Sequence, residues 1–299
     1  MKKTAILLSF LVGMNLVSAQ EKSAPVRKAD HKNQTAYNPY RKGAIFLYWG
    51  WNRALYSNSD VHFRGNDYDF TLHNMVAKDR PTDFSFNDYL NPLRVTIPQT
   101  NARIGYFIKD NLALVLALDH MKYVMKQDQT TDFTGKISDP HYAAMVRDGK
   151  VDLTDGEFLT FEHTDGLNYV NIGAEKYNKI YQGNNFNITW SYGGGLGVLY
   201  PKSNVKLFGN ERSDRFHVAG FGLDARASLN FVFWKHIMAR VEAKYGYINM
   251  PDVKTTLNDR PDKAQQDFVF GQVNFGVGYI FQTRKSKYSH KLKLVAVFI

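Results

Sequence analysis

Cysteine is absent from all 299 residues of the chain. The protein therefore has no disulfide, no thiolate metal site and no cysteine nucleophile. Beyond the first 19 residues there is no run of about 18 or more apolar residues, which excludes a protein that crosses a membrane with helices. Acidic residues are also few, because 38 Lys and Arg face 28 Asp and Glu and give a formal charge of +10.

Aromatic residues, by contrast, are plentiful. The mean hydropathy of −0.39 is that of a polar chain, yet 14% of the residues are aromatic, with 18 Tyr and 21 Phe. A barrel that crosses a membrane with strands has this composition, because half of its strand residues face a polar lumen and aromatic girdles lie at the two interfaces.

The N-terminus has the layout of a secretory signal peptide. Two lysines precede a short apolar stretch at 5–12, and small residues form a cleavage site that ends at Ala19. We therefore expect residues 1–19 to be a signal peptide, removed after Sec export. Residues 20–42 are polar and basic and predict an N-terminal segment in the periplasm.

Segments of alternating hydrophobicity recur along the rest of the chain, each about as long as a membrane-crossing strand. This pattern predicts an all-β fold, a transmembrane antiparallel up-and-down β-barrel over 43–281, with eight strands preferred in a range of eight to ten. Residues 59–77 are expected to form an outer excursion, and 282–299 form either a basic tail or one more strand. The eight predicted strands are 43–56, 101–108, 112–124, 167–180, 185–199, 216–233, 237–248 and 268–281.

The connections between these segments alternate in length. Tight turns are predicted at 109–111, 182–184 and 235–236, and long polar loops at 127–166, 200–215 and 249–266. Short periplasmic turns and long outer loops are typical of outer-membrane barrels. A soluble β-sandwich is the alternative. It is less favoured because the second face of the strands is small, rich in glycine and charged.

Together these features resemble a known class of proteins. The signal peptide before Gln20, the aromatic strand GAIFLYWGWNR and the run of hairpins are similar to small outer-membrane β-barrel proteins of the Bacteroidetes type, with the architecture of OmpA-like barrels. The resemblance covers most of 43–281 and carries no catalytic motif. It implies insertion into the outer membrane of a Gram-negative bacterium by the barrel-assembly machinery. A nucleic-acid partner is not expected for an exported barrel.

Charged residues lie on the face that would point into the lumen. The interior of an eight-stranded barrel is filled by side chains, so we expect these charges to pair as a polar plug. A proton or ion path is the alternative, and a small-solute channel would need a wider barrel. The residues are Arg103, Asp119, Glu175, Asp224, Arg226, Arg240, Glu242 and Lys244.

Basic residues on the opposite face lie just beyond the apolar stripe. His120, Lys122 and Lys126 share one strand, and Arg215 and His217 are expected at the same height on another. Cations at this level would meet the phosphates of lipopolysaccharide. The alternative is that they are ordinary interfacial side chains whose charged ends reach water.

Candidate acid–base pairs are few. Asp119 and His120, and Glu162 and His163, flank one long loop, and His62 lies near the outer end. A barrel enzyme that modifies lipid A or phospholipids would need a histidine base held by a carboxylate near a serine or water. Adjacent strand residues face opposite ways, so Asp119 cannot orient His120 directly.

No metal or cofactor is expected. Acidic residues at 152–157 offer oxygen ligands, but without the spacing of an EF-hand. The sequence therefore predicts a non-enzymatic outer-membrane barrel with a structural, surface-interaction or narrow ligand-binding role. A lipid-modifying enzyme and a solute channel are the alternatives.

Overall fold

A computed structural model gives the structure of most of the chain, apart from its two ends. The expected signal peptide at 1–19, residues 20–36 and the tail at 283–299 lie outside the described residues. The side chains of Asp165 and Arg215 are likewise outside them. The residues described are 37–91, 94, 98–210, 213, 215–257 and 262–282.

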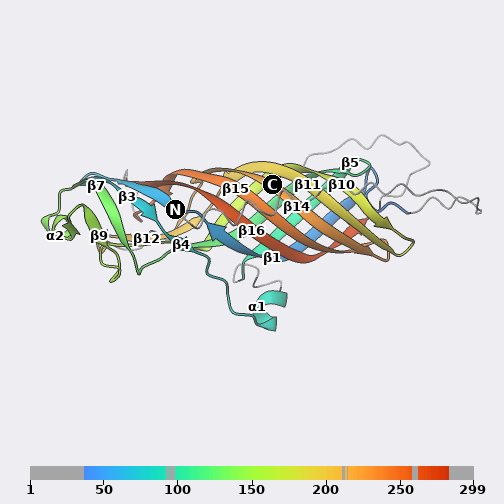
Figure 1. Cartoon of the computed structure of the whole chain (residues 1–299), viewed down its shortest axis with the longest axis horizontal. Coiled ribbons are helices and arrows are strands. Elements are labelled where there is room, and N and C mark those ends of the chain that lie inside the picture. Colours follow the sequence, from blue (N-terminus) through green and yellow to red (C-terminus); the bar gives the residue numbers. More distant parts are fainter. Residues whose placement is uncertain are drawn as a thin grey trace, which may run out of the picture. The chain divides into compact units, whose positions relative to one another are not determined.

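Eight antiparallel strands close into a barrel (Figure 1). Each pairs with the next along the chain, and the first closes on the last, from Ile45 opposite Phe281 to Tyr56 opposite Phe270. The predicted up-and-down barrel of eight strands is therefore confirmed. The strands are β1 (Ile45–Tyr56), β5 (Thr100–Lys109), β6 (Leu112–Met125), β10 (Leu159–Gln182), β11 (Phe186–Leu199), β14 (Gly220–Phe233), β15 (Ile237–Lys254) and β16 (Lys263–Phe281).

An apolar belt surrounds this barrel. Burial alternates along most of each strand, so that the large apolar side chains at every second position are exposed on the outer face. A soluble protein rarely exposes so large a continuous apolar surface, and a closed ring leaves no unpaired strand edge to lipid. The barrel therefore spans a membrane. The belt includes Ile104, Leu114, Leu116, Leu118, Ile172, Trp190, Leu196, Val198, Leu223, Leu229, Val241, Tyr245, Val273, Phe275 and Val277.

The predicted tight turns join strands at one end, which we call the short-turn end. Asn111, Trp234 and Lys235 have positive φ angles of 61°, 48° and 74° there, which allow the chain to reverse within a few residues. In the part of the chain that the structure describes, no helix is long and apolar enough to cross a membrane.

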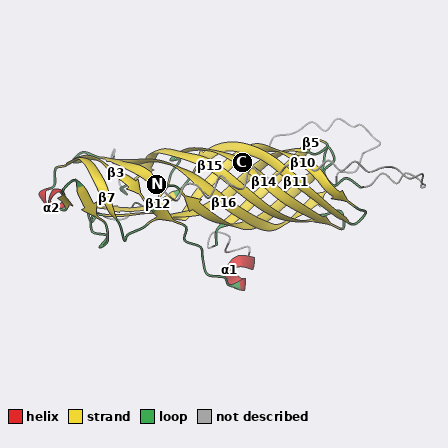
Figure 2. Cartoon of the chain, viewed as in Figure 1, coloured by secondary structure: helices red, strands yellow, loops and turns green. Residues whose placement is uncertain are grey.

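At the other end the sheet continues past the belt as an extension (Figure 2). The hairpin β2–β3 pairs with β16, and β7, β9 and β8 follow it in the sheet. β12 pairs with β10 and β13, and β4 pairs with β6. The short elements are β2 (Ser59–Arg64), β3 (Tyr68–Met75), β4 (Ala77–Lys78), α1 (Phe86–Leu90), β7 (Thr130–Ile137), α2 (Pro140–Ala144), β8 (Val146–Arg147), β9 (Lys150–Asp152), β12 (Lys202–Leu207) and β13 (Arg215–Phe216).

The prediction of a long loop at 127–166 is therefore wrong in part, because much of this segment forms regular secondary structure. The segment supplies β7, β8, β9 and the first residues of β10. Its strands are short and mostly polar, and only a few apolar side chains such as Val151 and Phe158 point into the extension. The period-two signal is too brief there to be read from the sequence.

The interior has three layers along the barrel axis. At the short-turn end, buried aromatic and aliphatic side chains form one layer, which includes Phe46, Phe107 and Tyr177. Charged residues fill the middle. Within the extension a second apolar core follows, which includes Tyr123 and Phe268. The inward side chains of β6 pass through all three layers, as Ala113, Val115, Ala117, Asp119, Met121, Tyr123 and Met125.

We predict that a charge in the belt destabilises the barrel, because lipid cannot solvate it. Leu116 is 53% exposed in mid-belt, and Leu116→Arg should lower the free energy of unfolding by about 2–4 kcal/mol in urea titrations in phospholipid vesicles. Leu257→Arg is the matched control, since Leu257 is 39% exposed in the β15–β16 loop of the extension. Equal losses for the two variants would contradict the lipid-facing assignment.

Candidate functional site

The structure brings all eight predicted lumen charges into the middle layer. None of these residues is more than 9% exposed. They come from five strands, with three on β15, two on β14 and one each on β5, β6 and β10. With four cations and four anions the set is electrically neutral. Its members are Arg103, Asp119, Glu175, Asp224, Arg226, Arg240, Glu242 and Lys244.

Salt bridges link these residues into one sequence of alternating sign, which we call the ion-pair chain. It begins at Lys244, whose Nζ contacts Asp119. Arg103 Nη2 lies 3.2 Å from the Oδ1 atom of Asp119. The other guanidinium nitrogen of Arg103, Nη1, lies 2.7 Å from Glu242 Oε2. A single arginine thus connects two carboxylates on different strands.

Arg240 continues the ion-pair chain in the same way. Its Nη2 lies 2.5 Å from Glu242 Oε2, and its Nη1 lies 2.9 Å from Glu175 Oε2. Arg226 Nη1 is 3.6 Å from Glu175 Oε1, and Arg226 Nε is 2.8 Å from Asp224 Oδ1. Every charge therefore has at least one opposite neighbour, and every interior member has two.

Neutral groups add hydrogen bonds to three of the carboxylates. Asn274 donates to Glu242 Oε1 at 2.8 Å, Tyr177 donates to Glu175 Oε2 at 2.8 Å, and Tyr169 donates to Asp224 Oδ2 at 3.1 Å. A buried charge is tolerated only when it is both paired and hydrogen-bonded. These amides and hydroxyls therefore stabilise the ionised form of the ion-pair chain.

A glycine on β11 makes room for the ion-pair chain. A Cβ atom at Gly195 would lie 2.5 Å from Arg226 Nη2 and 2.9 Å from Asn171 Oδ1. Any larger residue would therefore displace the guanidinium. The glycines at 193–195 lie within β11 and allow the close packing of wall and lumen there.

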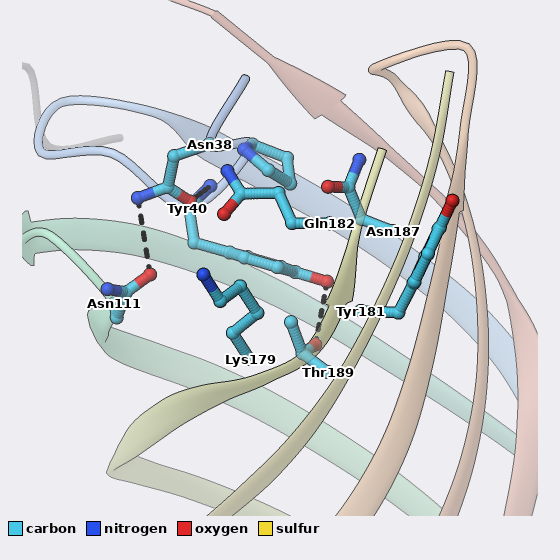
Figure 3. A pocket seen from close by; sticks show the side chains of 9 residues that line it. Asn38, Tyr40, Asn111, Lys179, Tyr181, Gln182, Asn187 and Thr189 are labelled. Atoms are coloured by element: carbon cyan, nitrogen blue, oxygen red, sulfur yellow. Dashed lines mark hydrogen bonds between the residues drawn. The ribbon is translucent and has the colours of Figure 1, made fainter. Parts of the chain in front are cut away.

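The short-turn end of the lumen is closed by the segment before β1 (Figure 3). Tyr40 lies across the opening. Its hydroxyl accepts from Thr189 Oγ1 at 2.9 Å, the contact drawn in the figure, and its ring stacks on Tyr177 at 4.7 Å. The remaining hollow has a volume of about 160 Å³ and is lined by polar side chains that include Asn38 and Gln182. The last residues of the predicted periplasmic segment 20–42 are thus part of the barrel.

Aromatic packing closes the side toward the extension. Tyr123 stacks on Phe268 with ring centroids 4.9 Å apart and meets Tyr56 edge-on at 5.0 Å. Tyr169 and Phe270 lie edge to face just beneath them. The ion-pair chain is therefore held between two apolar layers.

The predicted headgroup residues lie in different environments. His120 is on the outward face of β6 but only 3% exposed, because β10 changes register between His163 and Leu167 and brings Asn168 Oδ1 within 2.8 Å of its Nδ1. Lipid contact predicted for His120 does not fit this position. The side chain of Arg215 lies outside the described residues.

The other three headgroup candidates remain closer to the surface. His217 Nε2 lies 2.8 Å from Asp252 Oδ2. Lys122 donates to Thr82 Oγ1 at 3.1 Å, and both Lys122 and Lys126 are partly exposed beyond the apolar stripe of β6. Contact of these three side chains with lipid phosphates stays a prediction from the sequence.

The acid–base candidates do not assemble a reactive centre. Asp119 and His120 lie on opposite faces of β6, as the alternation requires. Glu162 Oε2 instead pairs with Arg80 Nη1 at 3.0 Å. His62 Nε2 lies 2.7 Å from Asp69 Oδ1 on the outside of the extension.

His163 has a partner that the sequence did not indicate. Its Nδ1 lies 2.8 Å from Ser203 Oγ of β12, 40 positions further along the chain. This part of β10 lies in the extension, beyond the belt, and both side chains are buried. Burial lowers the pKa of His163 to about 3. The histidine is therefore neutral and out of reach of a substrate.

Acidic residues at 152–157 are occupied by their own loop. Asp152 Oδ1 accepts from the backbone N–H of Thr154 at 3.0 Å, and Asp155 Oδ1 accepts from that of Glu157 at 2.8 Å. Among the described residues, no group of three or more His, Asp or Glu is arranged to hold a metal ion.

Comparisons with known proteins find only distant likenesses. No protein-family model matches the sequence, and no curated protein gives a significant match. Among solved structures, outer membrane protein OprG from Pseudomonas aeruginosa is 10% identical with a TM-score of 0.37, covering 82% of this chain and 98% of its own. Outer membrane protease OmpT from Escherichia coli is 10% identical with a TM-score of 0.38, covering 84% and 100%.

Ail, the attachment invasion locus protein of Yersinia pestis, is 14% identical with a TM-score of 0.30, covering 80% of this chain and 99% of its own. Likenesses this distant carry no argument about what the chain does. The Bacteroidetes type therefore stays a prediction from the sequence.

We predict that breaking the ion-pair chain at its centre is costly. Arg240→Met leaves Glu175 and Glu242 short of a partner in the lumen, and should lower the free energy of unfolding in vesicles by about 3–5 kcal/mol. Arg240→Lys keeps the charge but cannot bridge both carboxylates with a planar fork, so its loss should be smaller. Arg147→Met, at an exposed position of the extension, is the control. If Arg240→Met matched this control, the ion-pair chain would not be a determinant of stability.

Proposed function

We propose that this chain is an outer-membrane barrel with a permanently filled lumen that holds a folded extension at the cell surface for interaction with other molecules. In this proposal the protein is non-enzymatic and conducts no solute. The ion-pair chain, bounded by apolar layers on both sides, is the observation that carries the proposal.

A channel is disfavoured by the contents of the lumen. A permeating ion would have to separate neighbours such as Arg103 and Glu242, which lie 2.7 Å apart. It would then have to pass the Tyr40–Tyr177 stack at one end and the Tyr123–Phe268 stack at the other. Eight-stranded barrels have interiors just wide enough for side chains to fill.

A lipid-modifying enzyme is disfavoured by access. In the described hydrogen bonds, the buried His163–Ser203 pair has no carboxylate partner and the exposed His62–Asp69 pair has no hydroxyl partner. His73 does join Asp60 Oδ2 at 2.9 Å to Thr134 Oγ1 at 2.7 Å, but on the exposed face of the extension, beyond the belt where acyl chains lie. Acyl transfer requires a nucleophile, a base and the substrate together in one place.

A surface-interaction role is favoured by the construction of the extension. Its apolar core includes a row of stacked rings, with Phe70 between Phe63 at 5.1 Å and Phe133 at 5.2 Å. This core holds the short strands as a folded platform. Its exposed face carries charges of both signs, such as the ion pair of Lys150 with Asp132 at 2.6 Å. A surface of this kind suits a polar partner.

The proposed location and orientation of the protein follow from the same features. It is exported to the outer membrane of a Gram-negative bacterium, inserted by the barrel-assembly machinery, and oriented with the extension outward, as the loop lengths indicate. In that orientation Lys122 and Lys126 lie close to the lipopolysaccharide phosphates.

Single-channel recording on the purified chain in planar phospholipid bilayers tests the closed lumen. We predict no stable conductance steps, because the ion-pair chain leaves no continuous aqueous path. Folded protein in the sample is verified by the shift in gel mobility between heated and unheated samples. Reproducible steps of one fixed size from folded protein would overturn the proposal.

A further inference from the structure

An exposed apolar segment lies on the connection between β4 and β5. Phe84, Phe86 and Leu90 lie within seven residues of one another in the sequence. Their side chains are 68%, 74% and 54% exposed. α1 makes up the last five residues of this segment, and Tyr89 on its other side is buried. We call residues 84–90 the side arm.

The side arm has a defined local structure. The hydroxyl of Ser85 caps α1 by accepting from the backbone N–H of Asp88 at 3.0 Å. Arg94 Nη1 lies 2.8 Å from Asp88 Oδ1 on the following turn. Phe84 and Phe86 meet edge to face at 5.3 Å. The exposed apolar side chains are thus presented by a folded element.

Tyr89 attaches the side arm to the outer wall of the barrel. Its ring lies 6.0 Å from that of Trp51 on the outward face of β1, and its hydroxyl accepts from Arg53 Nη2 at 3.1 Å. Trp51 in turn lies 5.7 Å from Phe275, a member of the apolar belt. Figure 1 draws α1 on the side of the barrel where β1 is labelled, away from the far end of the extension at α2.

The attachment lies at the edge of the belt nearest the extension. Arg53 is paired with Val273 in the β1–β16 register, and Val273 is 55% exposed to the outside. The side arm therefore continues a surface that already faces lipid. Trp51, Tyr89 and Arg53 at its base are the residue types that gather where acyl chains meet headgroups.

We propose that the side arm inserts Phe84, Phe86 and Leu90 among the acyl chains of the membrane leaflet on the extension side. Its occupant is lipid, because the exposed face is apolar and continuous with the belt. The arrangement is that of a short interfacial element buried at the headgroup boundary. This inference rests on the membrane-spanning belt and is independent of the closed lumen.

The absence of cysteine makes a direct test possible. Phe86→Cys carries a nitroxide label, and the chain is reconstituted in vesicles of phosphatidylcholine and phosphatidylglycerol. Collision of the label with oxygen, which concentrates in lipid, is compared with collision with a water-soluble nickel chelate. Leu116→Cys in the belt is the lipid reference, and Asp148→Cys in an exposed turn of the extension is the water reference.

We expect the oxygen-to-nickel ratio at Phe86 to be close to that at Leu116 and several-fold above that at Asp148. Phe84→Cys should behave in the same way, which guards against a local effect of one label. A ratio equal to that at Asp148 would overturn the proposal. Exclusion of both reagents would also overturn it, because the side arm would then be covered by protein.

Discussion

Charges buried in a narrow space must neutralise one another in place, and this constraint governs the barrel. The lumen holds four cations and four anions, and water is kept out at one end by Tyr40 and at the other by Tyr123. Because the signs alternate along the ion-pair chain, every carboxylate except Asp224 at its end separates two cations. The same contacts that make the charges tolerable also fill the lumen, so closure and stability have one cause.

Along a long strand such as β6, the alternating side chains pass through three environments, which are the apolar layer at the short-turn end, the charged middle layer and the apolar core of the extension. On β6 the outward residues pass from the belt at Leu118 to basic positions at Lys122, while the inward residues pass from Ala117 through Asp119 to Tyr123. On β6 the change from belt to basic residues on the outside thus coincides with the change from Asp119 to Tyr123 on the inside. This change is what lets a membrane barrel continue into a water-exposed extension without a break in the sheet.

Much of this was predictable from the sequence, because strand side chains alternate with a period of two. The eight strands and the inward parity of the eight charges follow from that period. The salt-bridge partner of each charge could not be predicted in this way, since Arg240 pairs with Glu175, which lies 65 residues away. The burial of His120 depends on a register shift in β10, and the His163–Ser203 contact depends on β12, a short strand inside a predicted loop.

Solid-state NMR of the full chain in lipid bilayers tests most directly whether the lumen charges are paired and dry. With labelled arginine and glutamate, the account predicts contacts between the Arg240 guanidinium and the carboxyl carbons of Glu175 and Glu242. It also predicts magnetisation transfer from water that is much slower at Arg240 than at the exposed Arg147. Transfer from water that is equally fast at both arginines, without the carboxylate contacts, would contradict the account.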